Sequence, residues 1–134
     1  MIKIIPCVIS LILIFQGFNL FQNKPLKQSI SDGREIYYDF CIRCHLVNGK
    51  GEYGRVPPLA GSDYLINNVE LSIRGIKYGL NGPILVNGEE YDGVMEDQGL
   101  DDEEIADVMN YILNNWGNKS KEIITEEQVA NINE

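Results

Sequence analysis

The chain has 134 residues, a hydrophobic fraction of 44% and a formal net charge of −9. This length accommodates one small domain, and the acidic balance excludes a nucleic-acid binder, which needs a basic footprint for phosphates. Three Cys and one His are the scarce chemical residues, so their placement decides most of what the sequence predicts.

The first 22 residues predict export. Lys3 precedes an almost unbroken apolar run from Ile4 to Phe21, which is the layout of a secretory signal. No clear small-x-small cleavage site follows, and an apolar run of about 18 residues is also long enough for a marginal membrane anchor. We therefore expect residues 1–22 to be a signal peptide or a retained N-terminal anchor. The protein is then periplasmic, either free or attached to the inner membrane.

The next segments predict a linker, a helix and a loop. Residues 23–31 show no apolar period and are expected to form a polar linker. Asp32 and Glu35 have the spacing of a capping box, which predicts a helix from about residue 33 into a cysteine motif. The Gly- and Pro-rich segment 47–61 predicts a loop.

The second half is predicted to contain two further helices, a hairpin and a tail. Residues 69–78 have helical spacing and stop at a glycine. Asn87-Gly88 between two short β-favouring runs predicts a tight hairpin. Asp101 and Glu104 predict a capped helix whose apolar stripe runs to Trp116. The tail, residues 119–134, is expected to contain a short helix because Thr125-Glu126-Glu127-Gln128 has another capping-box spacing.

The segment Cys41-Ile42-Arg43-Cys44-His45 predicts the chemistry. Attachment of haem requires two thiols three positions apart, which add to the two vinyl groups of the porphyrin. It also requires an imidazole directly after them, which reaches the iron. The pattern therefore predicts one covalent haem c bound at Cys41 and Cys44, with His45 as a ligand of the iron.

Three other interpretations of this motif are weaker. A zinc site needs four ligands, and outside the export segment the chain offers only these three of the Cys/His type, so an Asp or Glu would have to complete it. A thioredoxin-like redox pair is expected after a strand of an α/β unit, and no such strand is predicted here. Chance placement in a structural loop is the third. Export favours haem, because c-type haem is attached outside the cytoplasm.

The second axial ligand of the iron would have to be a methionine, because His45 is the only histidine. Outside the export segment the methionines are Met95 and Met109. Met109 lies in a predicted helical stripe, where methionine is more often a core residue. Met95 lies in a loop before the last long helix and is the expected ligand. Ligation by Met109 and an open or water-bound position remain as alternatives.

Residues 32–118 resemble a class I mono-haem cytochrome c, and they are most similar to small bacterial domains found alone or fused to dehydrogenases, oxidases and nitrite reductases. The resemblance rests on the attachment motif and on residues 56–65, 82–95 and 100–118. It implies an all-α cytochrome c fold, with three to five helices around one covalently bound haem and a small β-hairpin.

The resemblance also implies specific contacts. The residue at the position of Pro57 would accept a hydrogen bond from the ring of His45, which fixes the orientation of the ring. The first and last helices would cross closely, with Gly33 and Tyr37 on one and Val108 and Tyr111 on the other. One position departs from the family, since Glu96 stands where proline usually follows the ligand methionine. Without proline the backbone there is freer, which predicts a looser loop and a weaker iron–sulfur bond.

The function expected from these features is single-electron transfer, by a periplasmic carrier or by a relay subunit of a respiratory complex that is not itself an enzyme. Ligation by His and Met raises the iron potential and leaves no coordination position for a substrate. The alternative is a haem enzyme or gas-binding protein with an open sixth site, such as a peroxidase. Met95 argues against the open site, and no second histidine exists for a distal role. A purely structural module would leave the haem without a purpose.

The charge pattern predicts the kind of partner. Between Tyr78 and Gly117 there are ten acidic residues and no Lys or Arg. Four of the acids, 101–104, are explained by the helix dipole that they flank. Five others flank the loop that carries Met95 and predict a redox partner with a basic docking face. They are Glu89, Glu90, Asp92, Glu96 and Asp97.

Overall fold

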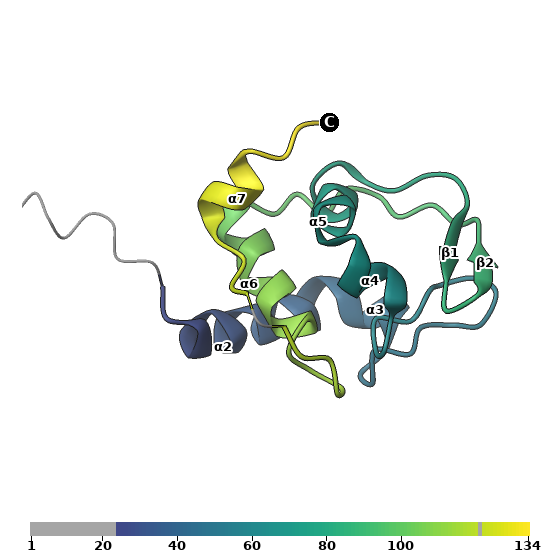
Figure 1. The fold of residues 1–134 in the computed structure, drawn as a ribbon, viewed down its shortest axis with the longest axis horizontal. Coiled ribbons are helices and arrows are strands. Elements are labelled where there is room, and N and C mark those ends of the chain that lie inside the picture. The colour runs from purple at the N-terminus through teal and green to yellow at the C-terminus, as the bar shows by residue number, and fades with distance from the viewer. Residues whose placement is uncertain (1–23, 121) are drawn as a thin grey trace, which may run out of the picture.

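The computed structural model describes residues 24–120 and 122–134 (Figure 1). The expected signal peptide or anchor, residues 1–22, lies outside this range. Among the described residues, none of the helices combines the length and hydropathy needed to cross a membrane. The elements are α2 (Leu26–Ile36), a π-helical turn η2 (Tyr37–Cys41), α3 (Ile42–His45), α4 (Asp63–Asn67), α5 (Val69–Tyr78), β1 (Ile84–Val86), β2 (Glu89–Tyr91), α6 (Asp102–Ile112) and α7 (Glu126–Ala130).

This arrangement is the all-α fold with a small hairpin that the sequence predicts. Helix α2, the π-helical turn and α3 form one continuous helix, so the described residues contain five helices. Figure 1 places α2, α6 and α7 toward one end of the molecule and the two-stranded sheet at the other. The strands pair antiparallel, with Ile84 opposite Tyr91 and Val86 opposite Glu89.

The N-terminal helix begins earlier than the sequence predicts. It starts at Leu26, after Pro25, so most of the expected linker at 23–31 is helical. The expected capping box is also wrong, because Asp32 lies inside the helix and accepts a hydrogen bond from Gln28 at 2.7 Å. The linker prediction failed because the buried side of this first turn is polar. Ser29 is buried, and its hydroxyl donates to Asp107 at 2.6 Å.

Helices α2 and α6 cross at Gly33, as the resemblance implies. A Cβ atom on Gly33 would lie 1.9 Å from the carbonyl oxygen of Asp107 and 2.8 Å from the backbone nitrogen of Val108. Only glycine permits backbones to approach this closely. One turn further along, the ring of Tyr37 packs on that of Tyr111, with centroids 5.4 Å apart.

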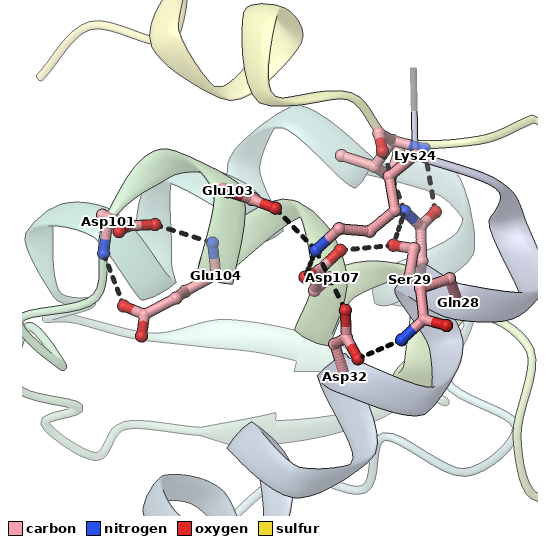
Figure 2. A network of polar contacts seen from close by, with 10 residues as sticks. Lys24, Gln28, Ser29, Asp32, Asp101, Glu103, Glu104 and Asp107 are labelled. Carbon is pink, nitrogen blue, oxygen red and sulfur yellow. Dashed lines mark hydrogen bonds and ion pairs between the residues drawn. The ribbon is translucent and has the colours of Figure 1, made fainter. Parts of the chain in front are cut away.

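A polar network fixes the start of α2 on α6 (Figure 2). The ammonium group of Lys24 lies 2.6 Å from carboxylate oxygens of Asp107 and Glu103 and 3.0 Å from Asp32. Partial desolvation lowers the pKa of Lys24, but the hydrogen bonds to these three carboxylates outweigh it and hold the pKa above its ordinary value. Only the Asp107 side chain is almost fully buried, at 6% exposure, so we expect that pair to contribute most of the stabilisation.

Three predictions for residues 69–116 are confirmed and one is wrong. Helix α5 ends at Gly79 (φ 86°), Asn87 and Gly88 have the positive φ values (52° and 85°) of a type I′ turn, and Asp101 and Glu104 form a reciprocal capping box. The stripe to Trp116 is not all helical, because α6 ends at Ile112. Trp116 instead has a φ of 48° and donates its indole N–H to the carbonyl of Val47 at 3.0 Å.

The tail after Trp116 returns to the body of the domain. The predicted short helix is present as α7, and the hydroxyl of Thr125 accepts a hydrogen bond from the Gln128 backbone at 3.2 Å. Asn110 of α6 holds the approach to this helix, because its side chain donates to the carbonyl of Ile124 and accepts from its N–H, both at 2.8 Å. Val129 is fully buried.

The hydrophobic core is unevenly distributed along the chain. Ten of the twelve buried residues in the main cluster come from Tyr37 or from the segment 105–129. The middle of the chain, 47–100, contributes Leu65 and Ile73. Most of the remaining half-buried apolar side chains of that middle segment line the cavity described next.

Candidate cofactor site

The two cysteines of the motif lie where the π-helical turn passes into α3. Cys41 is half-buried, Cys44 is exposed, and the two do not form a disulfide. A π-helical turn in an otherwise α-helical segment is a local departure from regular geometry, and such turns occur frequently at functional sites. Cys41 lines an inner cavity and Cys44 lines an adjoining outer one. Both cysteines of the motif therefore line the same hollow.

The two thiols have different environments. Burial raises the pKa of the Cys41 thiol to about 11, and the neighbouring Cys44 adds to the effect. A thiol with such a pKa is a poor nucleophile and a poor redox-active group at neutral pH. This environment disfavours the thioredoxin-like interpretation of the motif, which requires a stabilised thiolate.

His45 is buried in a form that could act as a neutral ligand. Only 9% of the residue is exposed, and its Nδ1 lies 3.1 Å from the carbonyl oxygen of Pro57. A carbonyl can only accept, so Nδ1 carries the proton and Nε2 keeps its lone pair. Burial lowers the pKa of the ring, and the Pro57 carbonyl opposes this lowering without reversing it. The contact that the resemblance implies between these two residues is thus present.

The loop between His45 and Pro57 is folded tightly enough to hold this contact. Leu46 reverses the chain with a φ of 63°, and the N–H of Gly51 donates to the carbonyl of His45 at 3.1 Å. A Cβ on Gly51 would lie 2.3 Å from the carbonyl oxygen of Val56, so only glycine fits. The loop predicted at 47–61 is therefore a defined support for the histidine.

The cavity is mainly apolar. Most residues that line its inner part are apolar, among them Leu59, Leu65, Ile76 and Val108, as is typical of cofactor sites. The inner and outer spaces share five lining residues, so they form one continuous hollow. These residues are His45, Pro57, Leu80, Ile84 and Met95. Two thiols, one neutral imidazole and an apolar wall fit a covalently attached, largely hydrophobic macrocycle with iron at its centre.

The structure separates the two candidate methionines. Met95 is half-buried and lines both parts of the hollow together with His45. Its backbone pairs with Leu80 through hydrogen bonds of 2.8 and 2.9 Å. Met109 is fully buried in the core cluster. The site residues predicted from the sequence, Cys41, Cys44, His45 and Met95, are therefore all brought to one space.

Helix α5 contributes a part of the site that the sequence analysis missed. Gly75 is buried in this helix and lines the cavity, and a Cβ there would meet only Leu80 within 4 Å, at 3.7 Å. A glycine inside a helix costs about 0.5–1 kcal/mol relative to alanine. Its presence at Gly75 is the signal that could have indicated a surface that must stay free of side chains.

The five acids around the Met95 loop are all exposed. Glu96 lines the outer part of the hollow. Glu89 accepts a hydrogen bond from the phenol of Tyr53 at 3.1 Å, and this contact raises the pKa of Tyr53. Glu96 is thus the one of these acids in the wall of the outer part, and Arg55 is the one Lys or Arg side chain lining that part.

Comparison with known proteins identifies the family. A family model for cytochrome c matches residues 30–116. Cytochrome c-552 of Thermus thermophilus is 44% identical over 96 residues, which cover 68% of this chain and 72% of that protein; a second c-552 sequence from the same species is covered over 64% of its length. The cytochrome c subunit of a quinone alcohol dehydrogenase from Gluconobacter oxydans is 28% identical over 104 residues, which cover 75% of this chain but only 21% of that subunit. The chain therefore belongs to the cytochrome c family, and it carries covalently bound haem c and transfers electrons.

Proposed function

We propose that the chain is an exported one-electron carrier in which His45 and Met95 are the two axial ligands of the haem iron. The observation that carries this proposal is the presence of His45 and Met95 in the wall of one apolar hollow, beside Cys41 and Cys44. A thioether as second ligand raises the reduction potential and fills the coordination sphere. Electrons then move through the exposed edge of the cofactor, without a bound substrate.

The protein residues have separate tasks in this function. The cysteines fix the cofactor covalently, and the hydrogen bond from His45 to Pro57 holds the imidazole in one orientation. The apolar wall from α5 and the hairpin excludes water, which limits the reorganisation of solvent on electron transfer. Cys44 is the exposed member of the pair, so the attached edge near it is the expected exit for the electron.

The expected export and the relatives together indicate where the carrier works and with what kind of protein. The Thermus relative is named as a cytochrome c-552, and the Gluconobacter relative as a subunit of a dehydrogenase. Both a free periplasmic carrier and a respiratory relay subunit, anchored or not to the inner membrane, agree with these two relatives. Electron transfer between larger redox proteins is the task common to both.

The ligand assignment is tested by two methionine variants. Met95→Ala should abolish the weak far-red absorption band of ferric iron bonded to a thioether and lower the midpoint potential, because axial ligands control potential over about 0.8 V. Met109→Ala is the control and should keep the band while the free energy of unfolding falls by about 2–5 kcal/mol. An exchange of these results would show that Met109 is the ligand. Native protein without the band would indicate an open sixth site and favour an enzyme or gas-binding haem protein.

We further propose a partner with a basic docking face. Glu89, Glu90, Glu96 and Asp97 are exposed and flank the Met95 loop. Negative charge beside the cofactor edge accelerates encounters with a basic surface, and salt screens this attraction over a Debye length of about 10 Å at 0.1 M.

The docking proposal is tested by neutralising these four residues to Gln or Asn. The association rate with the physiological partner should fall and lose its dependence on salt, whereas the haem spectrum should not change. The matched control neutralises four exposed acids outside the lining of the hollow, namely Glu35, Glu122, Glu126 and Glu127. A native association rate that stays flat or rises with salt would exclude electrostatic steering and point to apolar docking or a permanent complex.

A further inference from the structure

We infer that Lys77 and Tyr78, by joining the C-terminal tail (residues 122–134) to the end of α5, act as positioning residues for Met95. This inference rests on the proposed ligation of the iron by Met95. It assigns the tail a role in the strength of the iron–sulfur bond, in addition to its part in the core.

Two adjacent residues at the end of α5 donate hydrogen bonds to the tail. The ammonium group of Lys77 donates to the carbonyl of Val129 at 2.9 Å. The phenol of Tyr78 donates to the carbonyl of Ile132 at 3.0 Å. Both acceptors are backbone carbonyls around the end of α7. The tail therefore restrains the last turn of α5 through these two hydrogen bonds.

Lys77 also reaches the start of α6. Its ammonium group lies 2.9 Å from a carboxylate oxygen of Asp102, and the hydrogen bond to Asp102 raises the pKa of Lys77. The lysine side chain is 18% exposed and that of Asp102 33%, so the pair is partly shielded from water. One side chain therefore connects the end of α5, the start of α6 and the tail.

The residues directly after Tyr78 are those that hold Met95. Leu80 exchanges two backbone hydrogen bonds with Met95, at 2.8 and 2.9 Å. A Cβ on Gly79 would lie 2.9 Å from the Met95 carbonyl oxygen and 3.3 Å from the backbone nitrogen of Asp97. The backbone around Met95 thus lies directly against residues 79 and 80, and its position follows theirs.

The Met95 segment needs such external support. Between Tyr91 and Asp102 the chain, described throughout this stretch, forms no helix or ladder, and its one strand-like contact is the pair with Leu80. Glu96 follows the ligand, so no proline restrains the backbone there. Lys77 restrains the segment at two places, because it fixes the end of α5 next to Leu80, which pairs with Met95, and the first residue of α6 at Asp102.

The tail is itself fixed well enough to transmit this restraint. Val129 is fully buried and Ile124 is 5% exposed, and both belong to the core cluster. Asn110 of α6 holds the backbone of Ile124 through two hydrogen bonds of 2.8 Å. The support for Met95 therefore runs from α6 through α7 to the last turn of α5.

The test combines Lys77→Met and Tyr78→Phe, which remove the three polar contacts and keep the apolar parts of both side chains. Ferric protein is titrated with free imidazole, which competes with the thioether of Met95 for iron, and the far-red band is recorded. One lost hydrogen bond corresponds to about a fivefold change in an equilibrium. We expect imidazole to bind at least about fivefold more tightly to the double variant, with a weaker far-red band and faster amide exchange at Leu80 and Met95. Tyr78→Phe alone is the milder variant if the double one does not fold.

Two matched controls separate positioning from general stability. Lys24→Met removes the ion pairs of a different lysine with Glu103 and Asp107 of α6 (Figure 2), and Tyr53→Phe removes a phenol hydrogen bond to Glu89. Both should leave the imidazole affinity and the far-red band as in the native protein, although the first lowers stability. Equal imidazole affinities in the native protein and the Lys77/Tyr78 variants would overturn the inference, as would an equal increase in Lys24→Met. If Met95 is not the ligand, Met95→Ala changes neither the imidazole affinity nor the far-red absorption of the native protein.

Discussion

The crossing of α2 and α6 gives the sharpest prediction about stability, through Gly33→Ala. The new Cβ would lie 1.9 Å from the carbonyl oxygen and 2.3 Å from the carbonyl carbon of Asp107. Contacts of carbon with backbone oxygen below 3.0 Å are essentially never seen, so the two helices must separate by more than 1 Å. The clash is with backbone atoms, and no rotation of a side chain relieves it.

The magnitude follows from three contributions. Overpacking of a core typically costs about 1–3 kcal/mol. Separation by about 1 Å also forfeits a quarter to a half of the dispersion energy of each contact along the crossing. Alanine regains up to about 1 kcal/mol through its higher helix propensity. We expect the dispersion loss and the regained helix propensity to offset each other approximately, so the free energy of unfolding should fall by about 1–3 kcal/mol, compared with the roughly 5–15 kcal/mol of a typical domain.

The assay is guanidinium unfolding of the ferric protein, followed by helix circular dichroism and by haem absorption. Ser31→Ala, at an exposed position of the same helix, is the control and should change stability by less than about 0.5 kcal/mol. If Gly33→Ala is destabilised by less than about 1 kcal/mol, or no more than the control, the close approach of the helices does not determine stability and the reasoning is refuted.

Two further predictions concern contacts on either side of this crossing. Lys24→Met should lower the free energy of unfolding by about 2–3 kcal/mol at pH 7, because it leaves the carboxylate of Asp107 buried with only Ser29 as a partner; a loss as small as that of the exposed-site variant Glu103→Gln would contradict this. The hydrogen bond from Lys24 also lowers the pKa of Asp32, so its stabilisation is complete above the ordinary Asp pKa and is lost as the pH falls through the lowered value. Acid unfolding curves of Lys24→Met should therefore be flatter than those of the native protein in the range of about pH 4 and below. Trp116→Phe should cost about 1–2 kcal/mol in thermal or chemical unfolding, since the indole loses its hydrogen bond to the Val47 carbonyl, and an unchanged stability would show that the indole is not a support for the loop after His45.

Local sequence patterns predicted the parts of the fold that are held by local contacts. Asn87-Gly88 determines its turn through positive φ values, and Asp101 with Glu104 satisfies the backbone at the start of α6. The cysteine motif is also local, which is why the sequence alone was enough to name Cys41, Cys44 and His45. Met95 as second ligand stays a prediction, reached by elimination among few methionines and from its position outside a helix.

The parts that sequence analysis missed are held by contacts between distant segments. The first turn of α2 buries Ser29 against Asp107, and no hydrophobic period marks a face that is held by hydrogen bonds. The end of α6 was placed too late because Trp116 continues the apolar stripe, although it turns back to pack on Gly49 and bond to Val47. The short helix α4, capped by Ser62, was not predicted because five residues are too few to show a period.

The uneven core has a consequence for how the protein matures. The helices at the two ends of the chain share a dense apolar cluster, whereas the middle, 47–100, adds only Leu65 and Ile73 to it. We expect the haem, once bound in the hollow lined by the middle segment, to add contacts that join the middle to the ends. Chains without haem should form the α2–α6 crossing first and leave the middle loosely held, with both thiols accessible for attachment. Attachment would then act as the committing step of folding, and chains that miss it would remain open to proteolysis.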